Sequence, residues 1–263
     1  MTTKPWGLRE AAVKYRSAGI GGMSVWQDAA AAYSDGHRAA GSMLRDEGIE
    51  VVSYVRGGFF TTLNGAERIK AIDENKRIID EAAEIGAPLV VLVCGATPGQ
   101  SLFESRKQIT EGIAASIEHA AAAGVKLGIE PLHPMYADSR SAVNTMSQAG
   151  AICDEVGYPN LGITADVFHI WWDDHLEEEI KKAGEKNQLF SFHICDWKNL
   201  PEDMLNDRGI MGEGVIDVSG IRRWVRDTGF SGYDEVEIFS NKYWAMDQDE
   251  YLDRIIKAYK ELS

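Results

Sequence analysis

The feature that most constrains the fold is a repeated alternation between short apolar runs and longer helical patterns. Between the runs lie stretches such as 67–87 and 101–125, where apolar residues recur at helical spacing and a glycine comes near the end. The short runs are apolar almost throughout, as parallel strands covered on both faces must be. Seven of them are legible, at residues 21–26, 49–55, 88–95, 126–132, 161–168, 189–196 and 234–240.

The length of the repeat favours a closed barrel over an open doubly wound sheet. The runs begin roughly every 30–40 residues, the size of one βα unit, and a (β/α)8 barrel typically needs about 250 residues. The run 21–26 is not followed by the GxGxxG fingerprint of a dinucleotide-binding sheet. No linker or low-complexity tract divides the chain. We therefore predict an α/β fold, a (β/α)8 TIM barrel that forms a single domain over residues 1–263.

The first strand of such a barrel is short or missing. Only residues 1–6 precede the first helical pattern, and Pro5 has no N–H to donate to a strand ladder. Either residues 1–4 supply a short piece of this strand, or the chain as given starts late relative to a full barrel. The sequence leaves both alternatives open.

Charge and composition argue against several classes of function. The formal net charge is −14, whereas binding a nucleic-acid backbone requires a basic face. No apolar run approaches the roughly 18 residues of a membrane span, and the N-terminus has no hydrophobic signal core. We expect a cytoplasmic protein with no nucleic-acid or membrane partner. Cys94, Cys153 and Cys195 lack close-paired spacing, so we expect free thiols.

Four polar residues lie at the carboxyl ends of different strand runs, where parallel α/β folds place their chemistry. An isolated Glu at a strand end is usually solvated, and a lone His in an apolar strand is usually a core residue. Four such residues on four strands favour a shared site near the barrel axis. We call them the strand-end cluster: Glu130, Asp166, His193 and Glu237.

The strand-end cluster has the composition of a divalent-metal site. Three carboxylates and one imidazole suit Mn²⁺, Mg²⁺, Co²⁺ or Zn²⁺ better than a thiolate-seeking metal. Without a cation, three neighbouring buried carboxylates would repel one another and be costly to desolvate. We expect all four residues to bind one divalent ion, with Mn²⁺ as the first choice.

Other polar and aromatic residues gather near the same strand ends. Sugar-sized sites use such walls, although core packing explains an average Trp equally well. Asp196 would be a further substrate or supporting residue if its side chain turned toward the mouth of the barrel. We expect substrate contacts from His169, Arg208, His133, Trp26 and Arg56.

The sequence resembles the sugar phosphate isomerase/epimerase superfamily, the xylose isomerase-like TIM barrels, over nearly its whole length. The segments that carry the resemblance are GIEPLHP (128–134), ADVFH (165–169), FHICDW (192–197), RGIMGEGVID (208–217) and EVEIFS (235–240). In that family the residues that match the strand-end cluster bind one divalent metal. The matching glutamates exchange protons with the substrate, and the residues matching His169 and Arg208 contact its oxygens. Ketose 3-epimerases usually carry Glu and Arg where this chain has Tyr136 and Asn199, which leaves the substrate open.

The resemblance implies a metal-dependent sugar isomerase or epimerase that works by proton abstraction next to a carbonyl, through a metal-bound enediolate. Glu130 and Glu237 would be the catalytic residues on either side of the reacting carbon. A lyase or dehydratase acting on a keto-sugar, keto-glycoside or keto-cyclitol, as inosose dehydratase does, is the alternative reaction. A catalytically silent sugar-binding barrel is a third hypothesis. The expected partner is a small sugar or keto-sugar, and a homo-oligomer stays open.

Overall fold

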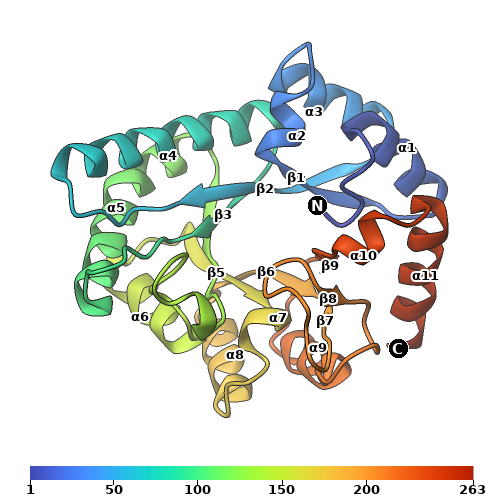
Figure 1. The fold of residues 1–263 in the computed structure, drawn as a ribbon. Helices are drawn as coiled ribbons and strands as arrows, with labels where there is room; N and C mark the ends of the chain where they lie inside the picture. Colours follow the sequence, from blue (N-terminus) through green and yellow to red (C-terminus); the bar gives the residue numbers. More distant parts are fainter. Residues whose placement is uncertain (263) are drawn as a thin grey trace.

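Seven parallel strands form the main sheet, and their hydrogen-bonded order follows the order of the sequence. The computed structural model describes residues 1–262. In Figure 1 the strands lie at the centre and the helices surround them, as the βα alternation predicts. The strands are β1 (Gly22–Trp26), β2 (Glu50–Gly58), β3 (Leu89–Val93), β4 (Lys126–Ile129), β5 (Leu161–Asp166), β6 (Leu189–Ile194) and β9 (Asp234–Val236).

The helices start and end at capping residues. The Asn64 side chain caps α4 by accepting hydrogen bonds from the backbone N–H groups of Ala66 and Glu67. The Ser101 side chain caps α5 by accepting one from the backbone N–H of Glu104. Side chains satisfy backbone donors that the first helical turn leaves unpaired. The helices are α1 (Leu8–Ser17), α2 (Gln27–Ala31), α3 (His37–Asp46), α4 (Gly65–Ile85), α5 (Leu102–Ala122), α6 (Met146–Val156), α7 (Val167–Ile170), α8 (Leu176–Glu185), α9 (Val218–Asp227), α10 (Asn241–Trp244) and α11 (Gln248–Glu261), with a 3-10 turn, η1 (Pro134–Tyr136).

The barrel is nearly closed between its first and last strands. Residues 1–6 form turns, and no strand precedes β1 within the described part of the chain. The Thr2 hydroxyl donates to Val236 O at 2.8 Å and accepts from Ile238 N at 3.1 Å, so the N-terminal segment lies against β9. Ser24 on β1 donates to the Glu235 carboxylate on β9. The predicted TIM barrel is therefore confirmed, with side chains and the N-terminal segment joining the edges where an eighth strand was expected.

The central strands β3 and β5 are buried on both faces, because helices cover the outside and side chains fill the inside. Every residue of β3 is buried, as the continuous apolar run 88–95 indicates. Gly41 lets α3 approach α4 closely, since a Cβ there would lie 2.2 Å from Ile85 O. The three cysteines are buried and free, as expected. In residues 1–262 no helix has the length and apolar character needed to cross a membrane.

A short hairpin beyond β6 brings a distant segment back to the mouth of the barrel. Its two strands, β7 (Asp196–Trp197) and β8 (Arg208–Gly209), pair antiparallel. Arg208 N donates to Phe239 O at 2.9 Å, which fixes β8 beside the segment that follows β9. The loop between its two strands, residues 198–207, makes up most of the sequence that separates Arg208 from His193.

Candidate metal centre and active site

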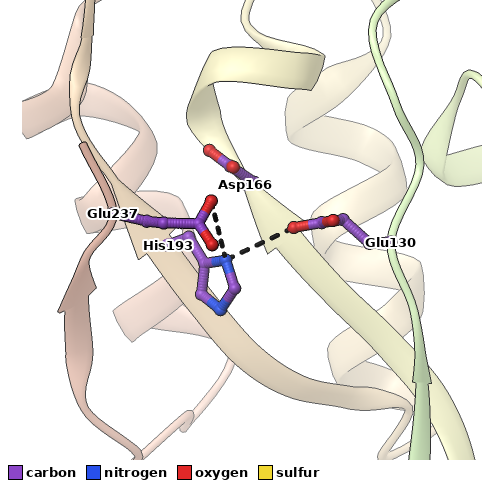
Figure 2. A group of neighbouring side chains, drawn as sticks. All are labelled: Glu130, Asp166, His193 and Glu237. Atoms are coloured by element: carbon purple, nitrogen blue, oxygen red, sulfur yellow. Dashed lines mark ion pairs between the residues drawn. The ribbon is translucent and has the colours of Figure 1, made fainter. Parts of the chain in front are cut away.

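The strand-end cluster converges at one point, as Figure 2 shows. One potential ligand atom from each residue lies within 4.8 Å of the others. His193 Nδ1 is 3.3 Å from Glu130 Oε1 and 3.9 Å from Glu237 Oε2. In this view Glu130 and Glu237 approach the imidazole from two sides, with Asp166 above it. The structure thus brings together all four residues that the sequence singled out.

The strand register explains this convergence. Asp166, the last residue of β5, pairs with His193 near the end of β6, and His193 pairs with Glu235 of β9. Glu130 and Glu237 directly follow β4 and β9. Asp166 also begins α7, because its Oδ1 accepts from Phe168 N at 2.9 Å. That bond fixes the carboxyl group and leaves Oδ2 turned to the site.

The cluster fits a divalent cation, because several of its buried polar atoms lack a partner. Glu130 Oε1 and both ring nitrogens of His193 are buried without a hydrogen bond. Buried polar atoms are nearly always paired in folded proteins, since leaving one unpaired costs about 1–3 kcal/mol. A cation accepts electron pairs from carboxylate oxygens and from a neutral imidazole nitrogen. An ion at this point would satisfy Glu130 Oε1 and His193 Nδ1 together.

The charges of the neighbouring side chains also favour a cation at this site. Burial lowers the pKa of His193, but the carboxylates of Glu235, Glu130 and Glu237 outweigh burial and raise that pKa to about 10. Burial raises the pKa of Asp166, against the lowering effect of the Arg208 charge. The carboxylates therefore create a strongly negative environment that favours a cation.

Arg208 is a fixed positive group beside the cluster. Its Nη1 donates to Asp166 Oδ2 and to Glu237 Oε2, both at 2.8 Å. The guanidinium lies between the rings of Phe168 and Phe239, 4.3 and 4.9 Å from their centroids. Burial lowers the pKa of Arg208, but the two carboxylates raise it well above its ordinary value. Arg208 therefore stays charged and holds two carboxylates in place.

His169 lies next to Arg208 and is buried. Its Nδ1 is 3.2 Å from His133 N, and its Nε2 is 3.2 Å from Arg208 Nη2. Burial, followed by the Arg208 charge, lowers the pKa of His169 well below its ordinary value. A neutral imidazole accepts at one nitrogen only, so only one of these two donors forms a hydrogen bond with the ring.

The other expected substrate residues also lie at the strand ends. The ring of His133 stacks on Trp197 with centroids 4.8 Å apart. Trp26, the last residue of β1, packs edge-on against Phe239 at 5.5 Å. Arg56 in β2 lies 6.0 Å from the centroid of the Trp26 ring. Their contact with a substrate stays a prediction.

The Asp196 side chain binds backbone N–H groups of the loop that follows β8. Its carboxylate accepts from the backbone N–H groups of Gly212 and Gly214, at 2.9 and 2.8 Å, and of Ile216 at 3.0 Å. It also accepts from Trp197 N at 2.8 Å. These bonds organise the loop after β8. Asp196 was a candidate only on the condition that it turned toward the mouth, and its carboxylate is instead bound by the N–H groups of this loop.

Glu235 is the residue that sequence reasoning missed. It accepts from Ser24 on β1 and from Ser191 on β6, the latter at 2.5 Å, and its Oε2 is 3.7 Å from His193 Nε2. Strand alternation gave a signal, because residues two apart on β9 point to the same side, and Glu237 was already placed inward. Glu235 thus lies on the Nε2 side of the His193 ring, whereas Glu130 and Glu237 lie on its Nδ1 side.

Comparison with known proteins agrees with this geometry. The family described as "Xylose isomerase-like TIM barrel" matches residues 12–262. The inosose isomerase of Bacillus licheniformis is 30% identical over 196 residues, which are 73% of this chain and 68% of that protein. The 3-dehydroshikimate dehydratase of Pseudomonas putida is 26% identical over 87% of this chain, but over only 35% of its own length.

Two solved structures resemble the whole barrel. Protein SMc04130 from Sinorhizobium meliloti 1021 has a TM-score of 0.95 and 44% identity, over 99% of this chain and 95% of that one. The IOLI protein, solved with a bound zinc atom, has a TM-score of 0.86 and 22% identity, over 99% of this chain and 95% of that one. At that identity the likeness to IOLI shows the fold alone. From the family match and the B. licheniformis relative, the chain belongs to the xylose isomerase-like TIM barrel family.

Proposed function

We propose that this protein is a divalent-metal-dependent isomerase or epimerase that moves a proton next to the carbonyl of a keto-sugar or keto-cyclitol. The observation that carries the proposal is the strand-end cluster, in which four ligand atoms lie within 4.8 Å of one another. The 30% identity to an inosose isomerase supports the reaction class. The proposed metal ligands are Glu130, Asp166, His193 and Glu237, with Mn²⁺ as the proposed ion and Mg²⁺, Co²⁺ or Zn²⁺ as alternatives.

Two carboxylates, Glu130 and Glu237, would exchange a proton with the substrate. A divalent ion, when bound, would polarise the substrate carbonyl and make the neighbouring C–H more acidic. Glu130 is buried and its Oε1 accepts no hydrogen bond, and a carboxylate that gives one oxygen to the ion keeps the other to take a proton. Glu237 Oε2 is held by Arg208 Nη1 on the other side of His193. A proton removed by one carboxylate and returned by the other to the opposite face gives epimerisation, whereas return at the neighbouring carbon gives isomerisation.

His169 and Arg208 would orient the substrate and offset the charge that develops on its oxygens. Arg208 is permanently charged and fixed between two aromatic rings, so it needs no rearrangement as that charge develops. His169 is buried, and its pKa is lowered, so it acts as a neutral hydrogen-bonding group. Both side chains lie beside Asp166, where substrate oxygens would meet the cation.

A dehydratase reaction is the second candidate, because the P. putida dehydratase is similar over most of this chain. Proton removal would be the same first step. The intermediate would then expel a β-hydroxyl group as water instead of being reprotonated. The strand-end cluster serves both outcomes, and the position of a leaving group on the substrate decides between them.

Deuterium incorporation tests the proposed function directly. The metal-loaded protein is incubated in D₂O with an inosose, a ketose and a 3-keto-glycoside, and the products are followed by NMR and mass spectrometry. We expect deuterium at the carbon next to the carbonyl in a product that keeps all its oxygens. Loss of water from the product would assign the dehydratase reaction. Absence of any metal-dependent exchange or elimination would refute the enzyme proposal in favour of a sugar-binding barrel.

Glu235 is expected to strengthen metal binding through His193. Its carboxylate beside Nε2 favours a proton on that nitrogen, which leaves Nδ1 free for the cation, and loss of such a partner typically weakens metal affinity about 10–100-fold. Glu235→Ala should show this loss in a calorimetric metal titration, while Glu235→Gln keeps an acceptor and should lose less. Glu178→Ala on the exposed face of α8 is the control. Unchanged affinity in Glu235→Ala would assign Glu235 to packing alone.

A further inference from the structure

Two arginines near the mouth of the barrel have no carboxylate partner. Arg56 lies in β2, and Arg140 lies in the loop after η1. Both are half-buried. Among residues 1–262, neither forms an ion pair, and aromatic rings lie within 6.0 Å of both guanidinium groups. The chain carries a net charge of −14, so two arginines without an ion pair stand out against an excess of acidic groups.

Aromatic rings connect both guanidinium groups to the site. Arg140 lies 5.5 Å from the centroid of the Tyr136 ring, and that ring packs edge-on against His169 at 5.9 Å. Arg56 lies 4.8 Å from the Phe59 centroid and 6.0 Å from the Trp26 centroid. Trp26 packs on Phe239, which in turn contacts Arg208. One ring, that of Tyr136, therefore separates Arg140 from His169, and two rings, those of Trp26 and Phe239, separate Arg56 from Arg208.

The backbone also holds the two segments side by side. Arg140 O accepts from Gly95 N at 2.9 Å, just beyond β3. A Cβ on Gly95 would lie 3.0 Å from Phe59 Cα, so the end of β2 approaches the same glycine. Gly95 has φ +99°, in the region that favours glycine. The end of β2, which carries Arg56, and the loop that carries Arg140 thus meet at this point.

The charges of the two arginines act on each other. Burial lowers the pKa of Arg56, and the positive charge of Arg140 lowers it further, while Asp28 and Glu130 act in the opposite direction. No ion pair joins Asp28 to Arg56 in the part of the chain that the structure describes. An anion between the two guanidinium groups would remove their repulsion and offset their desolvation.

We propose that Arg56 and Arg140 bind an anionic group of the substrate, a carboxylate or a phosphate, so that the substrate is an acidic keto compound. This inference rests on the proposed function of the same site. A divalent ion and Arg208 would balance the three carboxylates of the strand-end cluster, which leaves the charges of Arg56 and Arg140 to a ligand. Guanidinium groups suit this role because their planar N–H donors match carboxylate and phosphate oxygens in pairs.

Matched pairs of ligands test the proposal by calorimetric titration of the metal-loaded protein. The carboxylate pair is shikimate and its uncharged methyl ester, and the phosphate pair is fructose 6-phosphate and fructose. We expect the anionic member of at least one pair to bind about tenfold or more tightly than its neutral partner, as a charged hydrogen bond provides. The pair that shows the preference identifies the anion. Equal affinity within both pairs would overturn the inference.

Variants of the two arginines test whether these residues cause the preference for the anionic ligand. Arg56→Gln and Arg140→Gln should each remove most of the difference in affinity between the anionic and the neutral member of a pair, while Arg56→Lys and Arg140→Lys should restore part of it. Arg38→Gln removes the same charge from a side chain that is 82% exposed, and it should bind like the wild type. An anion preference that persists in both Gln variants would overturn the inference.

The outcomes separate this inference from the proposed function. Metal-dependent deuterium exchange without any anion preference would leave the function standing and remove the role of the arginines. An anion preference that disappears in Arg140→Gln, in a protein without exchange on any substrate, would keep the arginine site and remove the proposed reaction. Thermal unfolding of each variant shows whether it is folded, and the Lys variants serve where a Gln variant is not.

Discussion

Replacing Glu130 by Gln is expected to slow proton exchange between substrate and solvent by about 10²–10⁴-fold, the usual contribution of a general base. Glutamine keeps the size of the side chain but cannot accept a proton. In the protein, Glu130 Oε1 is buried without a hydrogen-bond partner, 3.3 Å from His193 Nδ1. The measurement is the rate of deuterium incorporation next to the carbonyl, followed by NMR in D₂O.

Two comparisons make this result specific. Because Glu130 is also a proposed metal ligand, the rate is measured at saturating metal, with metal content checked for each sample. Glu178→Gln, an exposed substitution on α8, should exchange at the wild-type rate. Glu237→Gln removes the second carboxylate, and its effects on exchange and on product formation tell which glutamate removes the proton. A wild-type exchange rate in Glu130→Gln would contradict the assigned chemistry.

Removing divalent ions is expected to abolish turnover and to destabilise the fold measurably. An ion present at 100 times its dissociation constant stabilises the folded state by about 2.7 kcal/mol. For a chain of this size that corresponds to a melting temperature higher by on the order of 5–10 °C. The measurement is thermal unfolding with chelator and after stepwise return of Mn²⁺, together with the exchange rate.

His193→Ala shows whether this stabilisation comes from the strand-end cluster. The variant lacks the only nitrogen ligand, so returned Mn²⁺ should raise its melting temperature much less than that of the wild type. His175→Ala is the matched control, because His175 is exposed at the start of α8. An equal metal-dependent rise in all three proteins would place the ion elsewhere.

The strands were predictable because their apolar runs are local in sequence, whereas their ends depend on tertiary contacts. The run 234–240 forms a strand only over Asp234–Val236. Beyond it the backbone leaves the ladder, since Phe239 O accepts from Arg208 N and Ser240 bridges to Asp207. The missing first strand was predictable from Pro5 and from the few residues ahead of the first helix. The way in which Thr2 joins β9 was not, because it depends on a residue more than 230 positions away.

The strand-end cluster was predictable for the same local reason, because each member is a polar residue at the middle or in the second half of an apolar run. Glu235 escaped notice because its role depends on Ser24 and Ser191, which strand closure brings to it from distant positions. Arg140 lies in a loop whose path is set by its bond to Gly95, and no periodicity in the sequence indicates that contact. Residues that act through loop packing thus require coordinates, while residues at strand ends do not.

The most direct test of the central claim is an anomalous difference map from crystals of the protein grown with Mn²⁺. The account predicts one strong peak at the carboxyl ends of the strands, bound by one atom from each of four residues. Those atoms belong to Glu130, Asp166, His193 and Glu237. A map with no peak there, in which Arg208 alone still joins Asp166 to Glu237, would contradict it.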